Sequence, residues 1–91
     1  MLERIFGGRA QTRILEFLLE NKGTFFNLSE IAEKVGVSPS TVGRIVDRLL
    51  EEGIVVEVGK WKQMRVIKVN EENQKTALLL KFVEELKKLK T

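Results

Sequence analysis

The side chains with the clearest chemical potential lie between residues 38 and 48. Ser38, Ser40 and Thr41 carry short hydroxyls, and Arg44 and Arg48 follow one and two helical turns later. At this spacing they share the outer side of a helix, where they can donate hydrogen bonds to base edges and phosphates in a DNA major groove. The pattern therefore predicts a DNA-reading surface; a simple solvated helix face is the plainer alternative.

A second basic group lies between residues 60 and 65. Lys60 and Lys62 flank Trp61, the only Trp of the chain, and Arg65 follows in the next predicted strand. Lys side chains on a loop neutralise DNA phosphates without demanding a fixed geometry. Trp61 has two interpretations that the sequence leaves open: it contacts a DNA groove, or it folds back on its own domain or into a subunit interface.

Composition argues against an enzyme. The 91 residues include no Cys and no His, which removes disulfides, thiol chemistry, the usual zinc sites and imidazole catalysis. Ser29, Ser38 and Ser40 have no candidate base to activate them. We therefore expect no catalytic residue, no cofactor and no metal.

The charge balance allows a nucleic-acid partner. Sixteen Lys and Arg oppose 13 Asp and Glu, which gives a formal net charge of +3 and favours a polyanion without requiring one. No apolar run approaches the ~20 residues of a membrane span, and the N-terminus lacks the apolar segment of a signal peptide. We expect a cytoplasmic protein with no membrane partner, and the many Lys and Glu residues favour a thermophilic source.

Apolar spacing places the hydroxyls and arginines on a helix-turn-helix. Two helices are predicted, over residues 29–35 and 39–52, with the chain reversing at Gly36. Ser38 supplies a cap for the second helix, and Gly53 can adopt the left-handed conformation that ends it. The core face of this helix would consist of Val42, Ile45, Val46 and Leu49.

The segments around this motif predict a small helical domain with a hairpin. A turn or short strand over residues 1–6 should precede a helix over residues 9–21. Phe25 and Phe26 are expected to form a one-rung strand with both rings in the core, paired with a later β-hairpin. The hairpin strands are predicted over residues 54–58 and 63–69, with the loop between them.

The C-terminal segment, residues 71–91, is predicted to be a dimerisation helix capped by Asn70. About 20 helical residues would span roughly 30 Å, longer than so small a domain needs. Its apolar stripe at three- and four-residue spacing would face a partner subunit, with packing on the chain's own first helix as the alternative. The stripe contains Leu79, Phe82, Val83, Leu86 and Leu89.

This order of elements resembles the winged helix-turn-helix DNA-binding domains of bacterial and archaeal transcription regulators. Residues 28–42 carry the most specific part of the resemblance, and residues 49–55 are similar to the passage from recognition helix to wing. Residues 6–15 are similar to the start of such domains in archaeal regulators. The resemblance implies a mainly α fold with a small antiparallel β-hairpin: a winged helix-turn-helix over residues 1–70 and an extra C-terminal helix.

The resemblance also implies sequence-specific binding of double-stranded DNA by a homodimeric transcription regulator. The recognition helix, residues 39–52, would enter the major groove, and the wing, residues 59–63, would contact the backbone or minor groove. Gly43 stands where many members carry a polar side chain, and the metal-sensing branch depends on Cys or His ligands that are absent. The implied DNA contacts are Ser38, Ser40, Thr41, Arg44, Arg48, Lys60, Trp61, Lys62 and Arg65.

A protein-docking module of the transcription or replication machinery remains a second hypothesis, because the same fold serves both purposes. Asp47, Glu51 and Glu52 lie beside the predicted DNA face and keep this alternative open.

Overall fold

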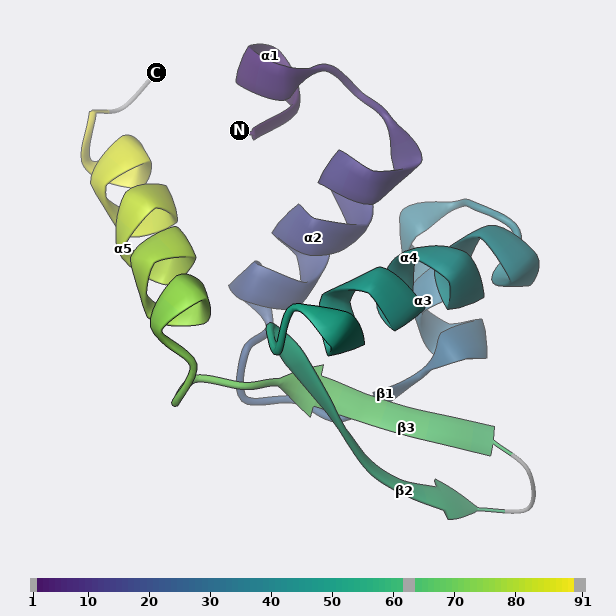
Figure 1. The fold of residues 1–91 in the computed structure, drawn as a ribbon. Coiled ribbons are helices and arrows are strands. Elements are labelled where there is room, and N and C mark those ends of the chain that lie inside the picture. The colour runs from purple at the N-terminus through teal and green to yellow at the C-terminus, as the bar shows by residue number, and fades with distance from the viewer. Residues whose placement is uncertain (1, 62–63, 90–91) are drawn as a thin grey trace.

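A computed structural model describes residues 2–61 and 64–89, with the backbone alone for residues 60 and 61. Within these residues it contains helices and a small antiparallel sheet (Figure 1). The elements in chain order are α1 (Leu2–Phe6), α2 (Ala10–Glu20), β1 (Phe26–Asn27), α3 (Leu28–Val35), α4 (Pro39–Glu51), β2 (Val55–Trp61), β3 (Met64–Val69) and α5 (Gln74–Lys88). The mainly α winged-helix architecture expected from the sequence is confirmed.

The sheet has the order β1-β3-β2, with both pairings antiparallel. Phe26 pairs with Ile67, and Val55 pairs with Val69. The short strand β1 therefore extends the hairpin to three strands, as predicted, and joins the wing to the start of α3. It covers Phe26 and Asn27 rather than the predicted Phe25 and Phe26.

The main core lies where α2, α3 and α4 pack against one face of this sheet. Ile14, Ile31, Val42, Val46 and Ile67 are each completely buried. Burying each such side chain contributes about 1.5–3 kcal/mol relative to leaving it exposed. This shared core fixes the helix-turn-helix relative to the wing.

A second, smaller cluster joins the two ends of the chain. Leu2 of α1, Leu19 of α2 and Val83 of α5 are buried together. Figure 1 shows α1 and α5 on the same side of the molecule, away from the tip of the hairpin.

Local chemistry sets the ends of the central helices as the sequence predicts. Asn27 and Glu30 form a reciprocal capping box at α3, with bonds of 2.8 and 2.9 Å. Ser38 caps α4 by accepting a hydrogen bond from the Thr41 amide. Gly36, with φ 78°, supplies the left-handed turn between the two helices.

The N-terminal segment differs from the prediction because it is a helix and not a turn or strand. The Gly7 amide donates to the Glu3 carbonyl at 2.9 Å, which closes a helical turn. Burial of Leu2 against Leu19 and Val83 stabilises that short helix, which is too short to be stable alone.

The expectation that both phenylalanines are core residues is wrong for Phe25. Phe26 is buried, whereas Phe25 is 55% exposed and its ring lies 5.3 Å from the Lys68 ammonium nitrogen. Adjacent side chains of an extended segment point to opposite sides of it, so only one of the pair can face the core.

The hairpin is longer than predicted. β2 does not end at residue 58 but continues through Trp61, with an irregular register between Glu57 and Gly59. A bulge of this kind absorbs an extra residue while pairing continues on both sides. Of the predicted wing, residues 59–61 therefore belong to a strand, and residues 62 and 63 lie outside the described residues.

The last helix is shorter than predicted. Asn73, and not Asn70, is its cap and accepts from the amides of Lys75 and Thr76. Asn70 instead donates to the Gly53 carbonyl at 3.1 Å. The 15 residues of α5 correspond to roughly 22 Å rather than 30 Å.

Across the described ranges, no helix has the length and apolar character needed to cross a membrane.

Gly53 provides a test of the junction between α4 and α5. Its φ is 76°, and a Cβ atom there would lie 2.5 Å from Asn73 Nδ2. We expect Gly53→Ala to lower the free energy of unfolding by about 1–3 kcal/mol in chemical denaturation.

Gly43→Ala is the matched control. A Cβ at Gly43 would make an ordinary 3.9 Å contact with Leu28 inside a helix, so this change should raise the free energy of unfolding by about 0.5–1 kcal/mol. Equal effects of the two changes would contradict the role assigned to Gly53.

Candidate nucleic-acid interface

The helix α4 has one face fixed in the core and one face open. Val42 and Val46 are completely buried, which sets the rotation of the helix about its axis. Ser40, Arg44 and Arg48 consequently lie exposed on the outer side. The division predicted from helical spacing is therefore present in the structure.

The three hydroxyls at the start of α4 lie together. Ser38 Oγ lies 2.8 Å from Thr41 Oγ1 and 3.3 Å from Ser40 Oγ. Because Ser38 also accepts from the Thr41 amide at 3.3 Å, its oxygen is occupied by the cap. Ser38 thus orients the helix start, and the hydroxyls of Ser40 and Thr41 both lie within hydrogen-bond distance of its oxygen.

The arginines of α4 are joined by an arginine from another element. Arg9, immediately before α2, lines the same small hollow as Arg44 and Arg48, about 180 Å³ in volume. Arg9 is absent from the predicted contacts because helical spacing says nothing about which helices meet in space. The only local signal is its place at the first residue of the predicted helix, residues 9–21.

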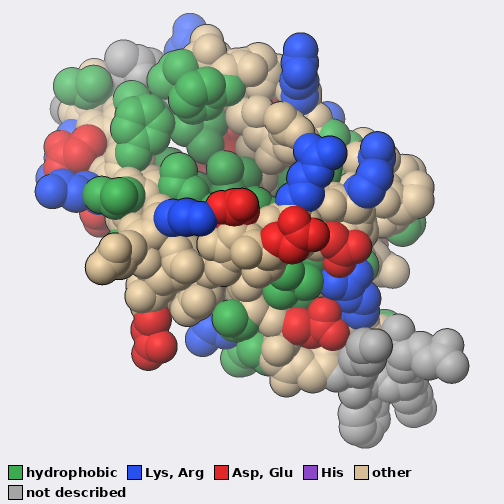
Figure 2. Space-filling model, in the orientation of Figure 1, with side chains coloured by type: hydrophobic (Ala, Val, Ile, Leu, Met, Phe, Trp, Pro, Cys, Tyr) green, Lys and Arg blue, Asp and Glu red, His purple; other side chains and the backbone are tan. Residues whose placement is uncertain are grey.

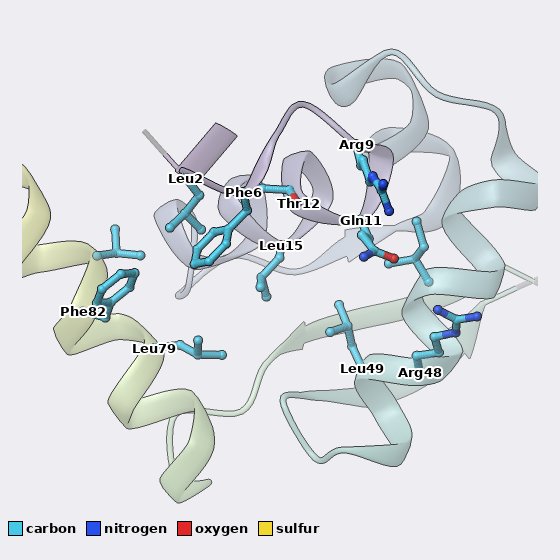
Figure 3. Close-up of a pocket in the computed structure, with 12 residues that line it drawn as sticks. Leu2, Phe6, Arg9, Gln11, Thr12, Leu15, Arg48, Leu49, Leu79 and Phe82 are labelled. Carbon is cyan, nitrogen blue, oxygen red and sulfur yellow. The ribbon is translucent and has the colours of Figure 1, made fainter. Parts of the chain in front are cut away.

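The outer face of α4 also borders a larger apolar groove of about 560 Å³ (Figure 3). Figure 3 shows Arg9, Gln11 and Arg48 along its α2–α4 side, with Phe6 and Phe82 on the side of α1 and α5. Its other apolar lining includes Leu2, Leu15, Leu49 and Leu79.

Arg65 behaves differently from the arginines of α4. It donates to Asp47 of α4 at 2.7 Å and to Glu57 of β2 at 3.1 Å. The hydrogen bond to Asp47, supported by that to Glu57, raises the pKa of the Arg65 guanidinium. Arg65 therefore ties both strands of the wing to α4.

The sequence pattern of the MarR family matches residues 8–59, which is more than half of the chain. The chain belongs to the MarR family. The match begins just before α2 and ends in β2, so it contains the whole helix-turn-helix and the first part of the wing.

Solved structures share the fold. A transcriptional regulator HlyU from Vibrio vulnificus CMCP6 is 18% identical, with a TM-score of 0.66 over 90% of this chain and 82% of that chain. HlyU from Vibrio cholerae N16961 is 16% identical, with a TM-score of 0.67 over 90% and 86%. NadR in complex with 4-hydroxyphenylacetate is 18% identical, with a TM-score of 0.60 over 91% of this chain and 63% of that chain. A comparison with curated protein sequences found no match.

This MarR-family chain is therefore a winged-helix regulator of the DNA-binding type and not an enzyme. Within the described ranges no three carboxylate side chains gather as metal ligands would. The C-terminal helix α5 lies outside the matched residues.

The acidic residues that favoured a protein-docking module have partners within the chain. Asp47 pairs with Arg65, and Glu52 pairs with Lys75. The hydrogen bond from Lys75 lowers the pKa of Glu52. Two of the three carboxylates that kept the docking hypothesis open are therefore compensated within the chain.

The backbone carries the basic residues of the wing to the far end of the hairpin. Lys60 pairs with Arg65 and Trp61 with Met64 across the strands, and Figure 1 shows this end projecting from the helices. The side chains of Lys60 and Trp61, and all of Lys62, lie outside what the structure describes. Their DNA contacts remain predictions.

The two carboxylate partners of Arg65 favour a role in supporting the fold over a contact with DNA, and a substitution can distinguish these two roles. We expect Arg65→Gln to lower the free energy of unfolding by about 0.5–1 kcal/mol, because its ion pairs are partly exposed. The dependence of DNA affinity on salt should change little, since the charge of Arg65 is already balanced.

Denaturation and salt titrations of binding measure the two effects, with the exposed Lys22→Gln as a charge-matched control. A fall of about one in the slope of log affinity against log salt would instead make Arg65 a phosphate contact.

Proposed function

We propose that this chain binds double-stranded DNA sequence-specifically as a homodimer and thereby regulates transcription. The observation that carries the proposal is the orientation of α4, whose buried Val42 and Val46 leave Arg44 and Arg48 on the open side. A helix held in this way can enter a major groove while the rest of the domain rests on the backbone.

The start of α4 is the part that would read bases. Side chains near the N-terminal end of a recognition helix reach base edges first, and here these are Ser40, Thr41 and Arg44. An Arg side chain can bind guanine through two hydrogen bonds, which gives the largest discrimination among these residues. Arg48, one turn further on, would contact a phosphate.

The wing would add affinity with little sequence preference. The backbone of Lys60 lies at the far end of the hairpin, and Lys62 follows it by two positions in the sequence. Flexible cations in this segment suit phosphates. Arg65 supports this contact by holding the hairpin against Asp47 of α4.

The role of Arg44 is tested by comparing two DNA duplexes. We expect Arg44→Ala to weaken binding to the preferred duplex by about 1–3 kcal/mol, because a base contact is lost. Binding to random-sequence DNA should weaken far less. Lys81→Ala, an exposed charge on α5, is the matched control, and equal losses on both duplexes would reduce Arg44 to a phosphate contact.

We further propose that residues 1–70 form the DNA-binding domain and residues 71–91 the dimerisation segment. One face of α5 supports this division, because Leu78, Phe82 and Leu89 are exposed at four- and seven-residue intervals. Glu85 lies on the same face, where its ion pair with Lys88 at 3.4 Å partly compensates its charge.

The short helix α1 extends this apolar surface. Ile5 and Phe6 are each more than half exposed, and Figure 2 shows apolar side chains gathered over the region of α1 and α5. A second copy of the chain would cover both helices and bury surface that a 91-residue domain cannot cover by itself.

Some residues of the predicted dimerisation stripe pack within the subunit, and others remain exposed. Val83 is 6% exposed, and Leu79 and Leu86 are half-buried beside it, so we assign these residues to packing within the subunit. Phe82 and Leu89 remain available to the partner. Two recognition helices held by such a contact would enter successive major grooves about 34 Å apart.

Oligomeric state tests the dimer surface. Leu78 and Leu89 are 69% and 68% exposed, so replacing both with Glu should leave the fold intact. We expect the double variant to sediment as a monomer and to lose preference for a palindromic duplex, because charges enter the interface. Val58→Glu, an exposed apolar residue on the wing, should sediment like the unaltered chain; a dimeric double variant would refute the proposed surface.

A further inference from the structure

We propose that Arg9 joins Arg48 to form a cradle for one phosphate of the DNA backbone, while Arg44 borders the cradle with its charge and remains free to reach a base. This inference rests on the proposed function and adds a contact from outside the helix-turn-helix. The cradle is the hollow of about 180 Å³ between the start of α2 and the outer face of α4. Its lining consists of Arg9, Ala10, Gln11, Thr41, Arg44, Ile45 and Arg48.

The charges around the hollow are uncompensated. In the part of the chain that the structure describes, no carboxylate lies within 4.0 Å of the guanidinium groups of Arg9, Arg44 or Arg48. By contrast, Arg13 and Arg65 both pair with carboxylates. Three like charges around one hollow repel one another until an anion joins them. The arrangement therefore fits a bound anion better than a structural ion-pair network.

The start of α2 adds to the positive potential. Its N-cap position is Arg9, and no side chain caps the amides of the first turn. Those amides carry the positive end of the helix dipole. An oxyanion in the hollow would meet guanidinium groups from the N-cap of α2 and from α4 together with this helix end, and guanidinium groups match phosphate oxygens in geometry.

A backbone phosphate is the source of the anion that the position favours. Thr41, Arg44 and Arg48 belong both to the cradle and to the outer side of α4. A phosphate held there would border the major groove that α4 enters, on the side toward α2. Figure 3 shows Arg9, Gln11 and Arg48 along this edge, separate from the apolar side chains of α1 and α5.

The position of Arg9 is set by α2. The Arg13 amide donates to the Arg9 carbonyl at 3.0 Å, which joins the Arg9 backbone to the first turn of that helix. The chain between α1 and Arg9 consists of Gly7 and Gly8, whose backbone freedom separates Arg9 from the packing of α1. Burial of Ile14 of α2 in the main core therefore places Arg9 beside α4.

Salt titrations of Arg9→Gln test the cradle, with Lys22→Gln as the control because Lys22 is an exposed cation that lies outside both proposed surfaces. We expect Arg9→Gln to weaken binding to specific and random duplexes alike, by about three- to tenfold, and to lower the salt slope by about one per subunit. Lys22→Gln should leave both quantities unchanged. Arg9→Lys should restore the slope but not the full affinity, because it keeps the charge without the planar fork.

Neutral methylphosphonate substitutions along the duplex locate the contact. One substituted position per half-site should weaken binding of the unaltered chain more than binding of Arg9→Gln, which keeps only the arginines of α4 beside that phosphate. If the unaltered chain binds DNA while Arg9→Gln keeps its affinity and slope, the cradle is wrong and the proposed function stands.

If the unaltered chain binds no duplex, the proposed function fails and the DNA cradle fails with it. A final experiment measures the binding of inorganic phosphate to the unaltered chain and to Arg9→Gln at constant ionic strength. Phosphate binding that depends on Arg9, without any loss of duplex affinity in Arg9→Gln, would overturn the backbone assignment in favour of a free phosphate.

Discussion

The burial of one face of α4 is the constraint on which the rest of the structure depends. Val42 and Val46 pack in one core with Ile14, Ile31 and Ile67, which come from three other elements. None of these five residues has any exposed surface. Such packing fixes how α4 is rotated, since turning the helix would bring a charged side chain into the core at a large cost in free energy. The direction in which Arg44 and Arg48 point is therefore a consequence of apolar packing.

The arginines of this protein form two groups: some pair with other groups of the chain and hold its elements together, and others have no carboxylate partner among the described residues. Arg13 donates to the carbonyl of Val35 and lies 3.6 Å from Glu3, while Arg65 holds the wing against α4. Among the described residues, the arginines around the α2–α4 hollow have no such partners. Ion pairs exposed to solvent contribute little to stability, so the main effect of the paired arginines is to set geometry. Unpaired arginines keep their charge available to a ligand.

Much of the fold follows from local chemistry that a sequence displays. Asn27, Gly36 and Ser38 act on atoms within a few residues, so the start and end of the central helices could be predicted. The wrong predictions concern places where two neighbouring residues of the same type could fill the same role. Asn70 and Asn73 are both able to cap a helix, and the choice was made by the bond from Asn70 to the Gly53 carbonyl, 17 positions away. Phe25 and Phe26 differ only in which side of the strand meets the core.

The sequence by itself determined the class of fold, the helix-turn-helix and the outward face of α4, because periodicity and capping depend on neighbours along one helix. Only the tertiary structure decided that Arg9 stands beside Arg44 and Arg48, that Arg65 is held by carboxylates, and that Val83 is buried within its own subunit. These outcomes depend on how helices and strands cross in space. That arrangement is set by the packing of the whole core, which no local spacing encodes.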